Sequence, residues 1–586
     1  MSTTTDSNPI LDFAIKYEFP EFTEEVGLDK IIQGDHSHKC PVYVTRKPPC
    51  SASCPADEDI RGYNNILRGV EGKHKKAEEK FEAAFNRIVE KNPFPGVMGR
   101  VCPAPCQGGC NRQYVEETIS INALEHAIGE FAIQNGLKLP PAGPSTGKKV
   151  ALIGGGPASL SAAYQLRLMG HAATIYEALP KLGGMVRYGI LGYRVSREVL
   201  DAEIQRILDL GVEVKTNTRV GKDITLEQLQ KDYDAVYVGV GAMKGRGIPI
   251  PGWKDGSEDT RTAIDVLLDF ELHNKTSIGK NVIVIGDGDV SMDAARISLR
   301  LGSQATLISA VAREEMRCSP NEYEEAVHEG TKVEFLWSSK EVIRDGSGKM
   351  TGLKVIQMER KQKGEDGWNH AIPFMRYKEI AGTEKVINGD MLIAAIGQTT
   401  DMNGLEKTVS EKSPFLQVDS NFEVKGMPGV FGGGDAYRID LITTAIGQGR
   451  KAAESINYYV NGREYPMKQR DDIIKFKDLK HDYFINTPAA KRTMSHPDNV
   501  VGNYQEILDK LEDAVAFKEA DRCMSCGMCF ECRQCMMYCP QEAIKMFKKN
   551  PIGEVMFTDY NRCVGCHICA EVCPTGYIDM AMGQDL

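Results

Sequence analysis

Two stretches of the chain share one pattern, in which a short apolar run leads into a glycine-rich turn and then a helix-length segment. The first begins at "VALIG" (150–154) and the second at "NVIVIG" (281–286). Such a run with glycines directly behind it is typical of a parallel strand that enters a helix through a tight turn. The pattern therefore predicts two α/β units of the doubly wound kind.

The same pattern divides the chain into regions. A later apolar run, "GDMLIAAIG" (389–397), predicts that the first unit resumes after the second, so that one domain is inserted in the other. Ahead of both units, helical stretches such as "KAEEKFEAAFNRIVEKN" end at the Pro/Gly-rich "LPPAGPSTGKK". The predicted regions are a helical N-terminal domain (1–145), the first domain in two parts (146–275 and 385–465), the inserted domain (276–384), a polar linker (466–518) and a cysteine-rich tail (519–586).

Composition narrows the class of protein. The 586 residues are 42% hydrophobic and 26% charged, and a net charge of −10 spread along the chain gives no reason to expect nucleic acid as a partner. No apolar run reaches the roughly 18 residues of a membrane span, and the start lacks the features of a signal peptide. We therefore expect a cytoplasmic protein. In a reducing compartment its 17 cysteines, clustered in two groups with Cys318 alone between them, favour metal sites over disulfides.

The tail contains two runs of four cysteines with the spacing C-x2-C-x2-C-x3-C-P, which is that of bacterial two-cluster ferredoxins. In that arrangement the fourth cysteine of each run serves the other cluster. One predicted [4Fe–4S] ligand set is Cys529, Cys532, Cys535 and Cys573. The other is Cys563, Cys566, Cys569 and Cys539. A pair of zinc knuckles is the alternative. The register leaves over Cys523 and Cys526, which we interpret as free or packed thiols.

The first glycine turn predicts a dinucleotide site. Gly154, Gly156 and Ser159 allow the backbone to approach a pyrophosphate at a helix N-terminus, and Glu177 is placed to bind ribose hydroxyls. Further features favour FAD over a nicotinamide at this site. They are a second glycine pair and a distant strand–helix junction: Gly183, Gly184, Gly434, Asp435 and Ala445.

The second glycine turn predicts a nicotinamide site, with Gly286, Gly288, Asp289 and Val290 as its binding residues. The next strand ends at Ser309 without the acidic residue that usually reads the ribose, and no arginine pair marks a 2′-phosphate pocket. Because Arg313 is nearby, the choice of cofactor stays open, with NADH favoured over NADPH.

Several motifs together resemble a known family: "PPCSASCP", "RVCPAPCQGGC", "GGGPASLSAA", "GGMVRYGI", "VIGDGDVSMDAAR", "REEM" and "GGGDA". Over about residues 40–465 the chain resembles the NADPH-dependent glutamate synthase small-subunit family. With "GDHSHKCPVYV" and the ferredoxin tail it is most similar to DsrL-type iron–sulfur flavoproteins, which are NAD(P)H-linked partners of dissimilatory sulfite reductase. The resemblance implies an α/β fold with two Rossmann-like domains, the second inserted in the first, between a helical iron–sulfur domain and a ferredoxin domain.

The resemblance also implies two [4Fe–4S] clusters in the N-terminal domain, and hence four in the chain. One would use Cys54, Cys102, Cys106 and Glu125. The other would use Cys40, Cys50 and Cys110, and here the sequence departs from the family because one thiolate is missing. Asp35, His36 or His38 would replace it, or this cluster is altered or absent; a zinc or purely structural role is the alternative for all six cysteines.

A second departure concerns the nicotinamide. NADPH-using relatives carry an Arg-Arg pair shortly before "REEM", whereas Ala310 and Val311 stand there in this chain. Arginine binds a 2′-phosphate through two charge-assisted hydrogen bonds, so its loss favours NADH.

The expected function is that of an NADH:acceptor oxidoreductase, with dissimilatory sulfite reductase as its partner and a homodimer as one expected state. The open alternatives are a ferredoxin-linked transhydrogenase subunit, a partner in a glutamate-synthase-like complex, and a non-catalytic electron-transfer subunit. No acid–base or nucleophilic group is required, because the cofactors supply the chemistry.

Overall fold

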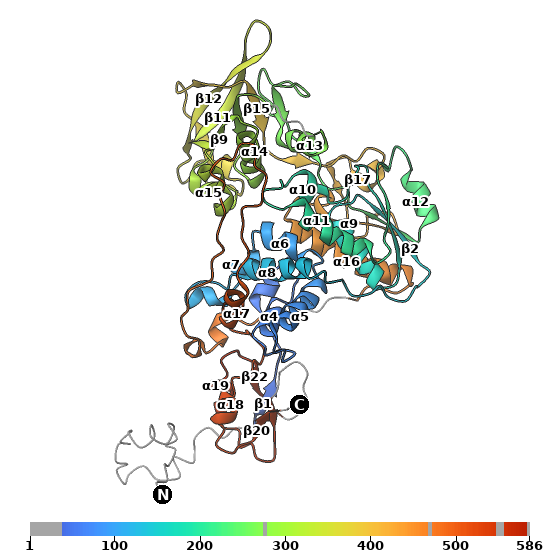
Figure 1. Cartoon of the computed structure of the whole chain (residues 1–586), viewed down its shortest axis with the longest axis vertical. Coiled ribbons are helices and arrows are strands. Elements are labelled where there is room, and N and C mark those ends of the chain that lie inside the picture. The colour runs from blue at the N-terminus through green and yellow to red at the C-terminus, as the bar shows by residue number, and fades with distance from the viewer. Residues whose placement is uncertain (1–37, 274–277, 467–470, 547–555, 583–586) are drawn as a thin grey trace, which may run out of the picture.

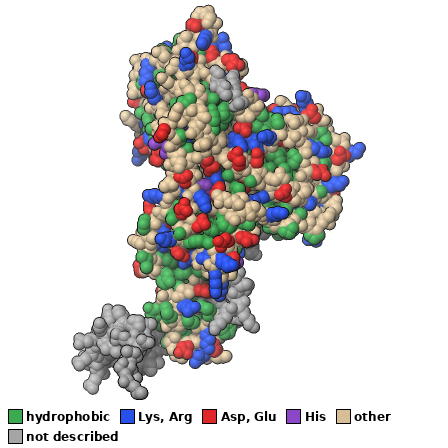
Figure 2. Space-filling view, viewed as in Figure 1, with side chains coloured by type: hydrophobic (Ala, Val, Ile, Leu, Met, Phe, Trp, Pro, Cys, Tyr) green, Lys and Arg blue, Asp and Glu red, His purple; other side chains and the backbone are tan. Residues whose placement is uncertain are grey.

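The computed structural model describes residues 38–273, 278–466, 471–546 and 556–582. Four units follow one another along its long axis: the inserted domain at one end, the first Rossmann domain beside it, the helical N-terminal domain in the middle and the tail at the other end (Figure 1). Acidic and basic side chains are interspersed over the face that Figure 2 shows. None of the helices in the described ranges combines the length and apolarity needed to cross a membrane.

The first Rossmann domain is a five-stranded parallel sheet with the strand order β19-β5-β2-β3-β4. Its strands are β2 (Lys149–Ile153), β3 (Ala172–Tyr176), β4 (Glu213–Lys215), β5 (Ala235–Val238) and β19 (Val430–Gly432). Because β19 lies far downstream of the other four in the sequence, the prediction that this domain is split is confirmed. Helix α9 (Pro157–Leu168) lies so close to α16 (Ile442–Val460) that a Cβ at Gly449 would collide with the carbonyl oxygen of Ala158.

The inserted domain begins earlier and ends later than predicted. Its parallel sheet has the order β10-β9-β8-β15-β7, and a second, antiparallel sheet packs on it. The parallel strands are β7 (Thr260–Thr262), β8 (Asn281–Ile285), β9 (Gln304–Ser309), β10 (Lys332–Phe335) and β15 (Met391–Ala394). The antiparallel strands are β11 (Trp337–Arg344), β12 (Met350–Arg360), β13 (Tyr377–Glu379) and β14 (Lys385–Asn388).

Strand β15 corrects the sequence prediction for residues 389–397. These residues do not resume the first domain; they form the strand between β8 and β7 of the inserted sheet. The predicted boundaries at 276 and 385 are therefore wrong. The physical reason is that a buried parallel strand is apolar on both faces, so its sequence does not say which of two such sheets it joins.

The N-terminal domain is a cluster of helices with a common core. They are α4 (Ile60–Leu67), α5 (Ala77–Val89), α6 (Pro95–Val101) and α8 (Ile121–Gln134). The helix predicted near residues 76–92 is confirmed as α5, which buries Phe81, Ala84, Phe85 and Ile88 along one face, as an amphipathic helix does.

Residues 471–512 of the predicted linker form a strap over these domains. It runs from the tail to the inserted domain and back, as the brown trace in Figure 1 shows, and there the N–H of Gly502 donates to the carbonyl of Arg300 at 2.7 Å. Arg492 donates to the carbonyl of Gly99 at 2.6 Å and to Asn122 Oδ1 at 2.7 Å. The strap ends in α17 (Asp513–Asp521), which packs on α4 and α8 of the N-terminal domain.

The tail pairs with the first described strand of the chain. Its elements are α18 (Gln534–Met537), β20 (Ile544–Met546), β21 (Met556–Thr558), α19 (Ile568–Glu571) and β22 (Ile578–Ala581). Strand β1 (Cys40–Tyr43) lies antiparallel to β22, with Cys40 opposite Ala581. The region around Cys40 therefore belongs to the tail rather than to the N-terminal domain.

A buried ion cluster offers a test of what stabilises the inserted domain. Glu329 accepts hydrogen bonds from Arg296 at 2.7 Å and from Arg300 at 2.6 Å, and its side chain is fully buried. We expect Glu329→Ala to lower the free energy of unfolding by about 3–5 kcal/mol, because it leaves the buried guanidinium of Arg300 without a carboxylate partner and leaves Arg296 with only its longer contacts to Glu322 and Glu325. Urea unfolding followed by tryptophan fluorescence measures this, since Trp253 and Trp337 pack against the core between the two sheets and Trp368 lies in the loop between β12 and β13 of this domain.

The matched control is Glu379→Ala, which removes an exposed ion pair with Lys340 from the same domain. It should cost at most about 1 kcal/mol. Equal unfolding midpoints for the two variants would show that the buried cluster does not stabilise the domain.

Candidate redox cofactor sites

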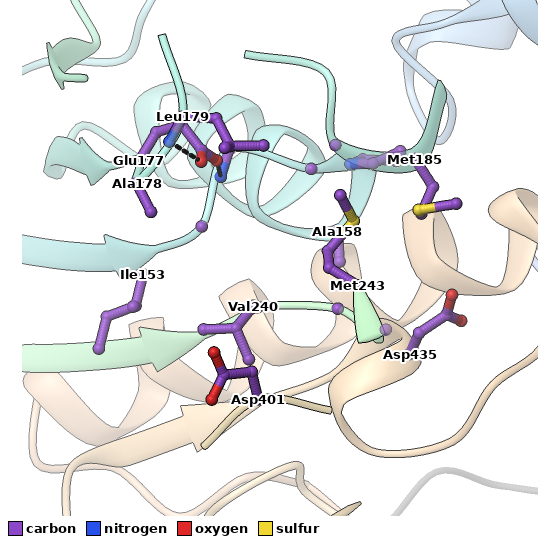
Figure 3. A pocket seen from close by; sticks show the side chains of 18 of the residues that line it. Ile153, Ala158, Glu177, Ala178, Leu179, Met185, Val240, Met243, Asp401 and Asp435 are labelled. Carbon is purple, nitrogen blue, oxygen red and sulfur yellow. Dashed lines mark hydrogen bonds between the residues drawn. The ribbon is translucent and has the colours of Figure 1, made fainter. Parts of the chain in front are cut away.

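A cavity of about 410 Å³ lies where β2 and β3 end and α16 begins (Figure 3). Most of the residues predicted to bind FAD border it: Gly154, Gly156, Glu177, Gly184, Gly434, Asp435 and Ala445. Segments far apart in the sequence therefore meet at one site, as the predicted split domain requires.

Glycine is needed where the backbone turns at this cavity. Gly154 has φ +94°, and a Cβ there would lie 2.5 Å from the carbonyl oxygen of Gly239. Gly184 has φ +50°, and its Cβ would lie 2.8 Å from the Cα of Gly156. These approaches keep two backbone segments close together at the edge of the cavity.

Ser159 and Gly183 are not among the residues that border the cavity. Ser159 is fully buried, and a Cβ at Gly239 would collide with its Oγ. It therefore occupies the position where helix and strand pack closely, which is the role of the third glycine in this kind of turn. The N–H of Gly183 donates to the carbonyl of Gly155 at 2.8 Å and so holds the second glycine pair against the first.

Two uncapped helix N-termini point to a phosphate-containing ligand in this cavity. The N-cap residues Gly156 of α9 and Leu441 of α16 provide no side-chain hydrogen bond, so backbone N–H groups and the positive ends of two helix dipoles are available. Glu177 accepts from the N–H groups of Gly155 at 2.6 Å and Leu179 at 2.7 Å, as drawn in Figure 3, and burial raises its pKa. The residues present thus fit a flavin dinucleotide.

Asp435 lies at the opposite side of the cavity from Glu177 (Figure 3). Burial raises its pKa to about 6, and its carboxylate accepts from the N–H of Asp440 at 3.1 Å. The loop that precedes α16 is thereby fixed to the residue that borders the cavity.

The second glycine turn has the same local geometry. Helix α14 (Asp289–Arg300) has Gly288 as its N-cap residue and so lacks a side-chain cap, and a Cβ at Gly286 (φ +154°) would lie 2.6 Å from the carbonyl oxygen of Ala395. This turn fits a second dinucleotide. Val290 packs into the apolar core of the inserted domain, so its side chain supports the turn from inside.

Asp289 and Arg313 are engaged by other residues. Asp289 accepts from the N–H of Ser319 at 2.8 Å and borders a second cavity, of about 440 Å³, between the inserted domain, the N-terminal domain and the strap. The guanidinium of Arg313 lies 3.7 Å from the centre of the Tyr323 ring.

Two cavities of about 20 Å³ in the tail are each bordered by four cysteines. Around one lie Cys529, Cys532, Cys535 and Cys573. Around the other lie Cys539, Cys563, Cys566 and Cys569. The structure thus brings together the two crossed sets that the spacing predicts.

The cysteine groups differ from single-ion sites. Among the described residues, no three His, Cys, Asp or Glu side chains converge closely enough to hold one metal ion. Thiols spread around a cavity suit a four-iron cluster, whose ligands bind at separate corners.

In the N-terminal domain, Cys54, Cys102 and Cys106 lie together with two carboxylates, Glu58 and Glu125. Burial raises the pKa of Cys54 to about 12, that of Glu58 to about 7 and that of Glu125 well above its usual value. Asn92 Nδ2 donates to Oε1 of Glu58 at 3.0 Å and to Oε1 of Glu125 at 2.8 Å. Glu58 is therefore a second candidate, beside the predicted Glu125, for the carboxylate ligand of this cluster.

Glu58 was not among the ligands predicted from the sequence. The available signal was its position only four residues after Cys54, in the short non-helical segment between α3 and α4.

The group predicted around Cys40 is different in the structure. The thiol of Cys40 lies beside that of Cys563 in the tail, because β1 pairs with β22, and it is not among the residues around Cys50 and Cys110. His38 is exposed two residues earlier, and Asp35 and His36 lie outside the described residues.

The two thiols that the ferredoxin register left over are the ones near Cys50 and Cys110. Cys523 and Cys526 border the same cavity of about 20 Å³, which we call the interdomain cavity. Burial, and then the thiols of Cys110, Cys523 and Cys526, raise the pKa of Cys50 well above its usual value.

The two N-terminal cysteine groups are neighbours. Tyr63 is fully buried; burial, and then Glu58, Glu125, Cys106 and Cys50, raise the pKa of its hydroxyl. One side chain thus lies close to members of both groups.

Three family models match the chain. The pyridine nucleotide-disulphide oxidoreductase family matches residues 148–449, just over half of the chain. Dihydropyrimidine dehydrogenase domain II, 4Fe-4S cluster, matches residues 21–137, and the 4Fe-4S dicluster domain matches residues 522–577.

Curated relatives align over most of the chain. NADP(+)-dependent formate dehydrogenase subunit beta of Moorella thermoacetica is 31% identical, over 82% of this chain and 71% of that protein. NADPH-Fe(3+) oxidoreductase subunit beta of Geobacter sulfurreducens is 32% identical, over 82% and 75%. Glutamate synthase (NADPH) small chain of Bacillus subtilis is 32% identical, over 70% and 86%. The resemblance to the glutamate synthase small-subunit family is confirmed, and the narrower similarity to DsrL-type proteins stays a prediction.

The glycine turn makes a test of the flavin cavity possible. We expect Gly154→Ala to weaken FAD binding by about tenfold or more, the effect of about 1.4 kcal/mol, because the new methyl group meets the carbonyl of Gly239. Gly241→Ala is the matched control: Gly241 also borders the cavity and has a positive φ, but a Cβ there meets nothing within 4 Å. Bound FAD per purified chain measures the difference, and equal retention by both variants would contradict it.

Proposed function

Because the chain belongs to the pyridine nucleotide-disulphide oxidoreductase family and is an NAD(P)H-dependent iron–sulfur flavoprotein oxidoreductase, we propose that it carries electrons between NADH and a redox partner protein through FAD and [4Fe–4S] clusters. A bound flavin exchanges two electrons with a nicotinamide and single electrons with an iron–sulfur cluster. The protein's part is to position these groups next to one another.

The observation that carries the proposal is the contact between the flavin cavity and the first cysteine group. A Cβ at Gly447 of α16 would collide with the carbonyl oxygen of Pro55, which directly follows Cys54. Ile442 and Ala445, in the first turn of the same helix, border the flavin cavity. One helix therefore contacts both the two-electron site and the nearest one-electron site.

The two Rossmann domains are joined by charged side chains. Arg194 of the first domain binds Asp293 of α14 at 2.8 Å and Glu322 of the inserted domain at 2.7 Å. These contacts act on α14, whose N-terminus carries the nicotinamide turn. They support a role for Arg194 in setting the position of the inserted domain relative to the flavin.

The preference for NADH rests on the end of β9. Val311 stands where NADPH-using relatives carry an arginine, and its side chain is buried against Met358 and Tyr377. Arg317 pairs with Asp287 at 2.6 Å, and Arg313 stacks on Tyr323. Neither cation is part of a side-by-side arginine pair of the kind that binds a 2′-phosphate at two points.

For the partner, we propose dissimilatory sulfite reductase, following the DsrL-type resemblance. The electrons would leave through the tail, which stands at one end of the molecule (Figure 1). A second candidate is a formate dehydrogenase complex, which the Moorella relative's name as a subunit beta favours. A homodimer and a cytoplasmic location stay predictions.

The test of function uses protein purified without oxygen. NADH should bleach the flavin absorbance and then that of the iron–sulfur clusters, and a coupled assay with purified dissimilatory sulfite reductase should show electron transfer between the two proteins. A flavin that stays oxidised with both NADH and NADPH would contradict the proposed function. Transfer to a formate dehydrogenase catalytic subunit, and none to sulfite reductase, would favour the second candidate.

A substitution at the end of β9 tests the cofactor preference. We expect Ala310→Arg to raise kcat/KM for NADPH about tenfold relative to NADH, because one charge-assisted hydrogen bond to the 2′-phosphate is worth about 1.5–3 kcal/mol. Ala310→Gln, a long polar side chain without charge, is the control and should leave the ratio within about twofold. The same shift in both variants would mean that charge is not the cause.

A further inference from the structure

We infer that Cys50, Cys110, Cys523 and Cys526 together hold one [4Fe–4S] cluster, built from two segments of the N-terminal domain and one segment that leads into the tail. This deepens the proposed function by naming the ligands of the cluster that connects the flavin side to the ferredoxin. The resemblance places Cys40 in this set, and the ferredoxin spacing leaves Cys523 and Cys526 without a role.

The first support is the cavity itself. The interdomain cavity has about the same volume, 20 Å³, as the two cavities in the tail, and like each of them it is bordered by four cysteines. The two tail cavities correspond to a known cluster spacing. A third four-thiol cavity of the same size, built from unrelated segments, points to the same kind of occupant.

The segment around Cys523 and Cys526 is firmly attached to the N-terminal domain. Three arginines of that domain donate to its backbone carbonyls. They are Arg61 to Cys526 at 2.7 Å, Arg68 to Cys523 at 2.9 Å and Arg112 to Arg522 at 3.1 Å. Such bonds fix the carbonyls on either side of the thiols, so the position of these two sulfurs relative to Cys50 and Cys110 is set by the fold.

Charge around the cavity also fits a thiolate cluster. Arg61 and Arg112 border it and are 8% and 2% exposed. The Nε–H of Arg61 is buried without a hydrogen-bond partner, and Asn111 Nδ2 donates to Cys526 Sγ at 3.6 Å. Buried donors and cations stabilise a buried anionic group, and hydrogen bonds to the sulfurs tune the potential of an iron–sulfur cluster.

The four cysteines around the interdomain cavity lie between two other cysteine groups, the one nearest the flavin and the first one of the tail. Helix α3 (Pro49–Ser53) carries Cys50 and is followed by Cys54, while α7 (Pro105–Gly108) carries Cys106 and is followed by Cys110. Each segment gives one thiol to the interdomain cavity and one to the group nearest the flavin. On the other side, Cys526 and Cys529 are three residues apart, so their Cα atoms are at most about 11 Å apart.

The test compares two double variants that remove thiols from different segments, Cys523→Ala with Cys526→Ala and Cys50→Ala with Cys110→Ala. Iron and acid-labile sulfide per chain are measured after anaerobic purification, with bound FAD as the check that the chain has folded. We expect each double variant to lose about four of about sixteen iron atoms, and the quadruple variant to lose the same four, because one cluster contains four irons. A loss of about eight in the quadruple variant would mean two separate sites and would overturn the inference.

The control is Cys40→Ala, which removes the thiol that the resemblance assigns to this cluster. If the interdomain set is correct, any iron that Cys40→Ala loses should add to the iron lost by the Cys50/Cys110 variant when the two are combined, because Cys40 lies in the tail. A non-additive loss with Cys50/Cys110, combined with unchanged iron in the Cys523/Cys526 variant, would restore the older assignment.

A second measurement needs no variant and so does not depend on their folding. In the iron-loaded wild-type chain, Cys523 and Cys526 should resist alkylation by iodoacetamide, and removal of iron with a chelator should expose them, as read by mass spectrometry. Alkylation at the same rate with and without iron would overturn the inference. Both readouts are independent of NADH, so a chain that fails to react with NADH but passes these tests would contradict only the proposed function.

Discussion

A short segment that carries two thiols three or four residues apart can serve two neighbouring cavities, and this constraint orders the whole molecule. It applies at α3, at α7 and at the loop between Cys526 and Cys529. Because every cysteine group shares a segment with the next, the groups cannot move apart without unfolding that segment. The order of the cysteine groups, from the flavin cavity to the far end of the tail, therefore follows from the local spacing of the thiols. Contacts between distant segments are needed only to complete each group.

The arginines around the interdomain cavity explain how such a row can be buried. Thiolates are costly to remove from water unless charge and hydrogen bonds compensate them. Arg112 and Arg522 are both almost fully buried, and both donate to backbone carbonyls as well as to Glu116. A buried pair of this kind contributes little net stability, but it is strongly destabilising when one partner is missing. It therefore fixes one arrangement of the tail on the N-terminal domain.

The chemistry of each local motif was predictable from the sequence, whereas the distant segment against which a motif packs was not. The turn at Gly154 and the crossed sets of the tail follow from spacing alone, because a tight turn and a two-residue gap leave the chain few conformations. Spacing does not say which sheet a buried apolar strand joins, so β15 was assigned to the wrong domain. It also does not show that β1 pairs with β22, which carries Cys40 away from Cys50. Both errors concern contacts between segments more than a hundred residues apart in the sequence.

The fold gives two irregularities of the sequence, a missing thiol and an extra pair of cysteines, a common explanation. The N-terminal domain lacks a thiol where the family pattern has one, and the tail has a C-x2-C pair ahead of the ferredoxin motif. Taken separately, the first suggests a defective cluster and the second suggests idle cysteines. The fold brings them to the same cavity, because α17 packs on α4 and directs the chain after it toward Cys50 and Cys110. A ligand set shared in this way makes the tail part of the N-terminal domain's own metal chemistry, so the ferredoxin is a structural continuation of the flavoprotein rather than an appended carrier.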